Sequence, residues 1–185
     1  MKIEIKNCWY YYLSLENDLA RTAQFVEPHS QESVYSFEFY KILVLACVEV
    51  ESLFKGFCAF LENENAVDIS IYKGILLKHL PQIVDAEVLI TRSGSSYKPF
   101  SGWNNSPLPW WETYNQVKHN RGEKLIEATY LNAVLALSAL YLLVLYYAKM
   151  TGADLPDQQS EYIVSKYSKK YLVVSPEEQL PGFDK

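Results

Sequence analysis

Glycine is scarce in this chain, at 7 of 185 residues. This scarcity argues against a loop-rich β protein and against a dinucleotide-binding fold. The sequence also lacks the GxGxxG and GxxxxGK[ST] strings whose backbone N–H groups cradle phosphates. The formal net charge of −5 gives no overall attraction to nucleic acid. Any contact with RNA therefore has to be local.

Cysteine is rarer still, and no cysteine–histidine pattern suggests a metal site. The 3 cysteines, Cys8, Cys47 and Cys58, are widely spaced, and the last two lie among apolar residues. This arrangement is typical of small buried side chains in a reducing compartment. CxxC and HExxH strings are absent, so we expect no metal and no cofactor. The N-terminal string MKIEIKNCWYYY lacks the apolar core of a signal peptide, which makes the cytoplasm the expected location.

One long hydrophobic run raises the question of a membrane span. Residues 131–148 are apolar apart from Asn132 and Ser138, and the run approaches the length of a spanning helix. A second long apolar segment, 34–60, carries interspersed charges that a lone spanning helix does not need. Because the central helix of a soluble bundle is also apolar all round, we predict a core helix without stable membrane association. A small membrane protein is the alternative.

Hydrophobic periodicity predicts mainly helices. Three helices are expected over 10–25, from an N-cap at Ser33 to residue 62, and over 69–80. A fourth begins at Pro109. Gly122 interrupts it before it continues as the central helix over 123–149. Segments 87–92 and 97–101 flank the string Ser93-Gly94-Ser95-Ser96 and predict a small hairpin.

These elements predict an all-α fold, an antiparallel bundle of four to five helices with a small β-hairpin insertion at 87–101. The helical domain is expected to cover 1–152. Residues 153–185 form a tail that packs on the domain or extends from it, with one strand-like string at 171–174. We interpret the lysines and tyrosines of this tail as solvated surface rather than as a basic aromatic patch. These residues are Lys166, Lys169, Lys170, Tyr162, Tyr167 and Tyr171.

The string WWETYNQVKHNR at 110–121 concentrates polar chemistry at the head of the central helix. On a helix Asn115 and His119 share one face, and Trp111 joins it one turn earlier. Tyr114, Lys118 and Arg121 lie on an overlapping face. A histidine beside cationic donors suits metal-free phosphodiester cleavage, because imidazole moves protons near neutral pH and cations stabilise charge on phosphate oxygens.

The aromatic residues of this string, Trp110, Trp111 and Tyr114, suit stacking on unpaired bases. The structural alternative is a solvated helix end, where cations are favoured by the helix dipole. In that interpretation His119 bonds a backbone carbonyl and the tryptophans only pack the foot of the helix. Spacing alone leaves both interpretations open.

Asn115-x3-His119, in a helix that leads into a long apolar helix, resembles the HEPN superfamily. The superfamily's signature is an arginine, often followed by asparagine, and then a histidine a few positions further on. Asn115 and His119 match the asparagine and the histidine, whereas the arginine position holds Tyr114. Lys118 and Arg121 are the nearby cations. The resemblance covers roughly residues 38–149 and implies a helical bundle of the HEPN type.

Catalytic HEPN proteins are typically metal-independent endoribonucleases of toxin–antitoxin and phage-defence systems, with a composite site formed across a homodimer. The resemblance implies that His119 is the acid/base, that Asn115 orients phosphate or the histidine, and that Arg121 or Lys118 stabilises the transition state. The remaining residues of the expected substrate-binding set are Tyr114, Trp111 and Glu49. The two aromatics are expected to contact substrate, and Glu49 is expected to orient a cation.

Two functions fit these residues. The first is a cytoplasmic endoribonuclease that acts on RNA in toxin, phage-defence or stress responses, as a homodimer through the 110–121 face and with a cognate antitoxin. The second is a non-catalytic dimerisation or nucleotide- or nucleic-acid-binding module, in which the degenerate motif is structural. Tyr114 favours the second function, and the Asn115–His119 pair with its cations favours the first.

Overall fold

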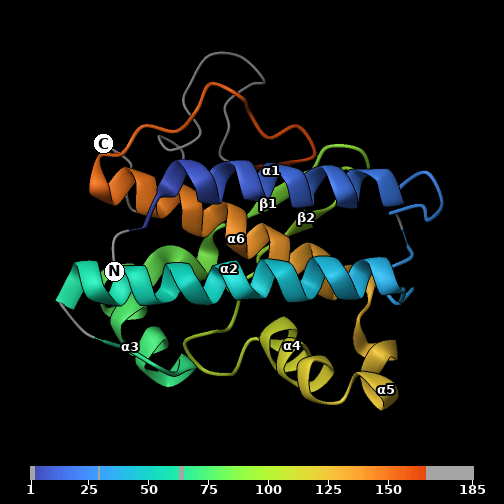
Figure 1. The fold of residues 1–185 in the computed structure, drawn as a ribbon, viewed down its shortest axis with the longest axis horizontal. Helices are drawn as coiled ribbons and strands as arrows, with labels where there is room; N and C mark the ends of the chain where they lie inside the picture. The colour runs from blue at the N-terminus through green and yellow to red at the C-terminus, as the bar shows by residue number, and fades with distance from the viewer. Residues whose placement is uncertain (1–2, 29, 63–64, 166–185) are drawn as a thin grey trace.

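The computed structural model describes residues 3–28, 30–62 and 65–165. Three long helices form its centre, namely α1 (Ile5–Thr22), α2 (Phe37–Glu62) and α6 (Tyr130–Thr151). In Figure 1, α1 and α2 run antiparallel at the front, and α6 crosses behind both. The shorter helices α3 (Ile69–His79), α4 (Pro109–His119) and α5 (Arg121–Lys124) lie below α2 in this view. The predicted mainly helical fold is therefore confirmed.

A small antiparallel sheet completes the fold. It consists of β1 (Val88–Ile90), β2 (Ser96–Tyr97) and β3 (Ile163–Ser165), in the order β2-β1-β3. Val88 lies opposite Tyr97 on one side and Ser165 on the other. The predicted hairpin is confirmed, with a shorter second strand. Two 3₁₀ turns, η1 (Pro81–Asp85) and η2 (Leu125–Glu127), lie elsewhere in the chain. The third strand comes from a segment that was expected to be tail, and the strand-like string at 171–174 lies outside the described residues.

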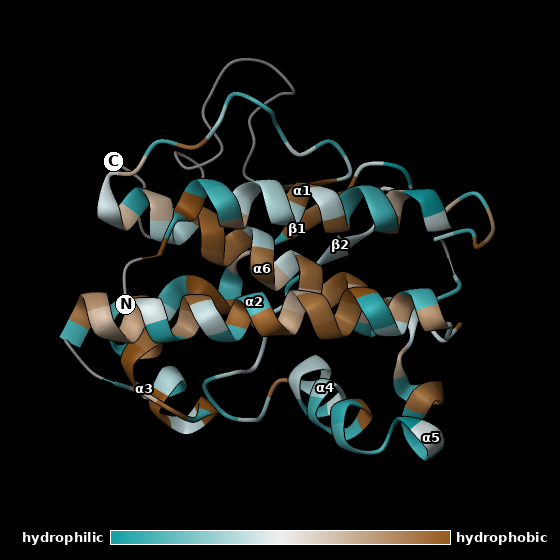
Figure 2. Ribbon diagram, in the orientation of Figure 1, coloured by the Kyte–Doolittle hydropathy of each residue, from teal (hydrophilic) through white to brown (hydrophobic). Residues whose placement is uncertain are grey.

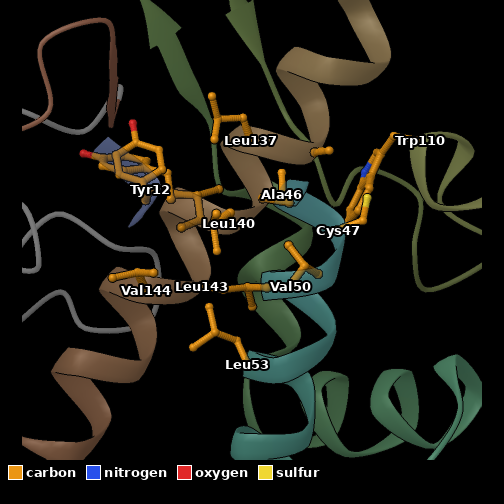
Figure 3. Close-up of a cluster of buried hydrophobic side chains, with 14 of the residues drawn as sticks. Tyr12, Ala46, Cys47, Val50, Leu53, Trp110, Leu137, Leu140, Leu143 and Val144 are labelled. Atoms are coloured by element: carbon orange, nitrogen blue, oxygen red, sulfur yellow. The ribbon is translucent and has the colours of Figure 1, made fainter. Parts of the chain in front are cut away.

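Helix α6 is the central core helix, as predicted. Figure 2 shows its middle as mostly hydrophobic, and Figure 3 shows side chains of α6 meeting those of α2 within one cluster, among them Leu137, Leu140, Leu143, Ala46, Val50 and Leu53. The Thr129 side chain caps its start by accepting from the Asn132 N–H at 3.3 Å. Within the described residues α6 alone is long and apolar enough to cross a membrane, and 83% of its most apolar stretch is buried. This burial fits a soluble protein.

The starts of α1 and α2 are among those that differ from the prediction. Helix α1 begins at Ile5 rather than residue 10, because a buried stripe at helical spacing extends toward the N-terminus through Ile5, Trp9 and Tyr12. Helix α2 begins at Phe37, with the Ser36 hydroxyl accepting from the Phe39 N–H at 3.1 Å, so Ser36 replaces Ser33 as the cap. Residues 32–33 instead form a turn, and the segment 32–35 lies beside residues 129–131, with a bridge between Tyr35 and Thr129.

The described part of the tail packs on the domain. It passes along α1, and the Trp9 indole donates to the Gln158 carbonyl at 2.8 Å. The Tyr162 side chain is buried, so the prediction that it lies in solvated surface is wrong. Its predicted neighbours Lys166, Lys169, Lys170, Tyr167 and Tyr171 lie outside the described residues.

Burial makes several tyrosine hydroxyls resist ionisation. Burial raises the pKa of Tyr72 to about 12, and burial with the nearby Glu32 carboxylate raises that of Tyr97 to about 12. The pKa values of Tyr12 and Tyr130 are raised further, again mainly by burial. Because the unfolded chain loses these protons first, stability is full below about pH 10 and falls as the pH rises above it.

We therefore expect alkaline unfolding above about pH 10, at about 1.4 kcal/mol per pH unit for each tyrosine that ionises only in the unfolded chain. Urea unfolding at stepped pH measures the loss. Absorbance at a tyrosinate band should show a group of tyrosines that ionises together with the loss of helical circular dichroism. Titration of every tyrosine in a chain that stays helical would contradict this expectation.

Candidate functional site

Helix α4 is fixed to the core by one aromatic side. Pro109 occupies its first turn, where a missing N–H costs nothing. The Trp110 indole is fully buried and donates to the Pro99 carbonyl at 2.8 Å, which ties the helix to the loop after β2. Trp111 packs against Phe54 of α2, with ring centroids 5.8 Å apart. The site segment thus stands on a rigid base.

This packing corrects the predicted role of the aromatic residues. Trp110 and Tyr114 are 0% and 1% exposed, and Trp111 is 7% exposed, so their rings are used in the core. We expected Tyr114 and Trp111 to contact substrate, but neither presents a ring face to solvent. The position that resembles the arginine of the HEPN motif is therefore a core position in this chain.

The opposite side of α4 carries the polar groups. Asn115, Lys118 and His119 are all exposed, and Asn115 and His119 share a face as their spacing predicts. The helix ends at His119, because Asn120 leaves the helical conformation with φ −139° and ψ 60°. An interruption was predicted at Gly122, with the central helix continuing from residue 123. The break comes earlier, at Asn120, and the central helix starts later, at Tyr130, because α5 and η2 intervene. Arg121 begins α5 and is also exposed.

Both cations of the site lie on aromatic rings. The Lys118 ammonium is 5.1 Å from the centroid of the Tyr114 ring, and the Arg121 guanidinium carbon is 5.8 Å from that of Tyr40. A hydrogen bond with the Tyr114 hydroxyl is the main cause that raises the pKa of Lys118, with a smaller contribution from the Glu51 carboxylate. In the described part of the chain neither cation forms a salt bridge. Their remaining N–H groups are therefore available to an external anion.

Glu49 lies away from these groups. It is five residues before Phe54, which places the two about 140° apart around α2. Glu49 faces α1 and lines a hollow of about 400 Å³ with Cys8 and Tyr11. Partial burial raises the pKa of its carboxyl. Within one chain Glu49 is thus not beside the cations. The Glu51 carboxylate instead acts on Lys118, and the Tyr40 ring lies under Arg121. The sequence contained no signal for either neighbour.

The site residues lie apart from two hollows of the described residues. Asn115, Lys118, His119 and Arg121 line neither the hollow beside Glu49 nor a groove between α1 and α2. Across residues 3–28, 30–62 and 65–165, no three histidine, cysteine or acidic side chains gather as a metal site would need. Burial raises the pKa of the Cys8 thiol to about 11, so this cysteine stays protonated at neutral pH. The chemistry open to the site is proton transfer by imidazole and charge stabilisation by two cations.

Comparison with known proteins adds no assignment: no protein-family model, no curated protein and no solved structure matches this chain.

Proposed function

We propose that the exposed side of α4, with Arg121, binds RNA and that His119 transfers protons in its metal-independent cleavage. We further propose that the chain is a HEPN-like cytoplasmic protein of a toxin–antitoxin, phage-defence or stress system. One observation carries the proposal. Lys118 and Arg121 lie on aromatic rings instead of pairing with carboxylates within the described residues, and both flank the exposed His119.

The proposed reaction uses only groups of the chain and of the substrate. The RNA 2′-hydroxyl attacks the adjacent phosphorus, and an imidazole accepts its proton as the 2′-oxygen–phosphorus bond forms. The bond from phosphorus to the 5′-oxygen breaks, and a protonated imidazole returns a proton to that oxygen. Lys118 and Arg121 donate to the phosphate oxygens, where negative charge develops, and the Asn115 amide orients the phosphate or the imidazole. The products are a 2′,3′-cyclic phosphate and a 5′-hydroxyl.

A non-catalytic RNA- or nucleotide-binding module is the second candidate. It is favoured by the burial of Tyr114, which leaves the arginine position of the motif without a group that reaches solvent. It is also favoured by the position of His119, which makes no hydrogen bond to an orienting side chain within the described part of one chain. In this case Lys118 and Arg121 bind phosphate and His119 is dispensable.

We expect His119→Ala to lower RNA cleavage in EDTA by about 10²- to 10⁴-fold, the usual contribution of a general acid or base. The melting temperature should stay nearly unchanged, because the side chain is exposed. Purified full-length chain is incubated with total RNA, and end-group analysis identifies the cyclic phosphate. His79→Ala is the matched control, since His79 lies at the end of α3 and pairs with Glu62 at 2.9 Å.

The same preparation separates the two candidates. RNA binding without cleavage, with the binding lost in Lys118→Glu and Arg121→Glu, would favour the binding module. If the folded wild-type chain neither cleaved nor bound RNA, both candidates would be wrong.

A further inference from the structure

A groove is lined by residues of the C-terminal end of α1 and the N-terminal end of α2. These two helix ends lie at the right of Figure 1. Its volume is about 560 Å³, within the range of sites that hold a ligand or a partner's side chain. Apolar and charged side chains both line it: Phe25, Val26, Phe39, Asp18, Arg21, Glu38 and Lys41. The site on α4 contributes no residue to this groove.

Large aromatic side chains stand exposed beside the groove. Phe25 lines it and is 86% exposed, and Phe37 and Tyr35, which flank the groove residue Ser36, are 69% and 50% exposed. A single exposed hydrophobic residue is ordinary, but an exposed aromatic ring that lines a groove, with two more exposed aromatics next to a groove residue in sequence, marks a candidate contact surface. The molecule thus presents a projecting ring and a recess on one face.

The charges of the groove are unevenly paired. The Lys41 ammonium lies 3.0 Å from Asp18 and 2.5 Å from Glu38, so two carboxylates share one cation. Arg21 lies one turn along α1 from Asp18, is exposed, and forms no salt bridge in the described part of the chain. The groove therefore carries one excess negative charge at its acidic cluster and one unpaired positive charge at Arg21.

We propose that this groove binds the same groove of a second copy of the chain in a two-fold symmetric dimer. Two-fold symmetry brings the projecting Phe25 of each copy to the recess of the other. It also brings each Arg21 to the partner's acidic cluster, so that both excess charges are neutralised. RNA is a poorer occupant, since its phosphates would meet Asp18 and Glu38.

This face differs from the 110–121 face that we expected to form a dimer. There the aromatic rings are buried in the core of their own chain, which leaves mainly polar groups for a partner. Stable interfaces need aromatic or aliphatic residues at their centre, and the groove supplies them. The proposal does not depend on RNA cleavage, because the dimer is measured without RNA.

The test is sedimentation or light scattering of the full chain from about 1 to about 100 μM. We expect a dimer for the wild type and a dissociation constant raised at least about 30-fold by Phe25→Glu, as for a central interface residue. Arg21→Glu should also weaken the dimer, because it places like charges together. Combining it with Glu38→Arg restores opposite charges across the two-fold axis and should restore the dimer.

Phe60→Glu is the matched control, because Phe60 is a 52% exposed aromatic at the far end of α2. It should leave the dimer intact, and circular dichroism checks that every variant is folded. A wild-type chain that is monomeric at the highest concentration would overturn the proposal. So would a dimer that Phe25→Glu and Arg21→Glu leave unchanged.

Discussion

Replacing Glu16 with alanine is expected to destabilise the protein by about 3–5 kcal/mol and to release the segment that ends in β3. Glu16 is a 6% exposed carboxylate on α1. One of its oxygens accepts from the Tyr12 hydroxyl at 2.9 Å and from the N–H groups of Tyr162 and Ile163 at 3.0 and 2.8 Å. The Ser160 hydroxyl also donates to it, at 2.5 Å.

The large effect has a simple cause. Alanine removes the acceptor and leaves several donors buried without a partner, each of which costs about 1–3 kcal/mol. The detached segment also gives up the pairing of β3 with β1, which aligns Ile163 with Ile90. Chemical denaturation measures the free energy, and amide hydrogen exchange at Tyr162 and Ile163 reports the release.

Glu16→Gln keeps one acceptor oxygen and should cost less, about 1–3 kcal/mol. Asn17→Ala is the control, since Asn17 is the exposed neighbour of Glu16 on the same helix. Unchanged protection of the Tyr162 and Ile163 amides in Glu16→Ala would show that strand pairing alone holds the segment.

The second large effect is expected for Trp110→Ala, at about 3–5 kcal/mol, the usual cost of deleting a buried aromatic side chain. The Trp110 ring contacts Phe100 and Trp111, with centroids 6.3 and 5.9 Å away. Its removal leaves a cavity under the first turn of α4 and an unpaired Pro99 carbonyl. Because α4 carries Asn115, Lys118 and His119, RNA binding or cleavage should fall together with stability.

Trp110→Phe separates the two contributions. It keeps most of the buried apolar area and loses the indole N–H, so it should cost about 1–3 kcal/mol. Chemical denaturation of both variants gives the comparison, and tryptophan fluorescence follows the unfolding. Equal losses for the two variants would show that the hydrogen bond to Pro99, and not packing, anchors the helix.

The candidate site was predicted in part from spacing. Helical periodicity placed Asn115 and His119 on one face, and the structure places both on the solvent side of α4. Periodicity does not say which face is buried when aromatic and polar residues are mixed. Tyr114 and Lys118 share a face by spacing, yet the first is buried and the second is exposed. The long Lys118 side chain reaches solvent across the Tyr114 ring.

Local elements whose signals lie within one segment were predictable from the amino-acid sequence. The apolar run of α6, the Gly152 that ends it with φ 66°, and the serine–glycine turn of the hairpin act through backbone and burial preferences of neighbouring residues. Predicted helix ends were wrong where a contact between segments distant in sequence sets the end. Helix α2 starts only at Phe37, because residues 32–35 pair with residues 129–131.

Features that join distant segments depend on how the whole chain folds. The pairing of β3 with β1, the hydrogen bonds of Glu16 to the N–H groups of that segment, and the groove that Arg21 and Phe25 share with the start of α2 each connect residues that no periodic pattern relates. The physical reason is that hydrogen bonds and apolar burial are satisfied by whichever partner the fold brings near. A carboxylate such as Glu16 has the sequence signature of a solvated side chain until the chain closes over it.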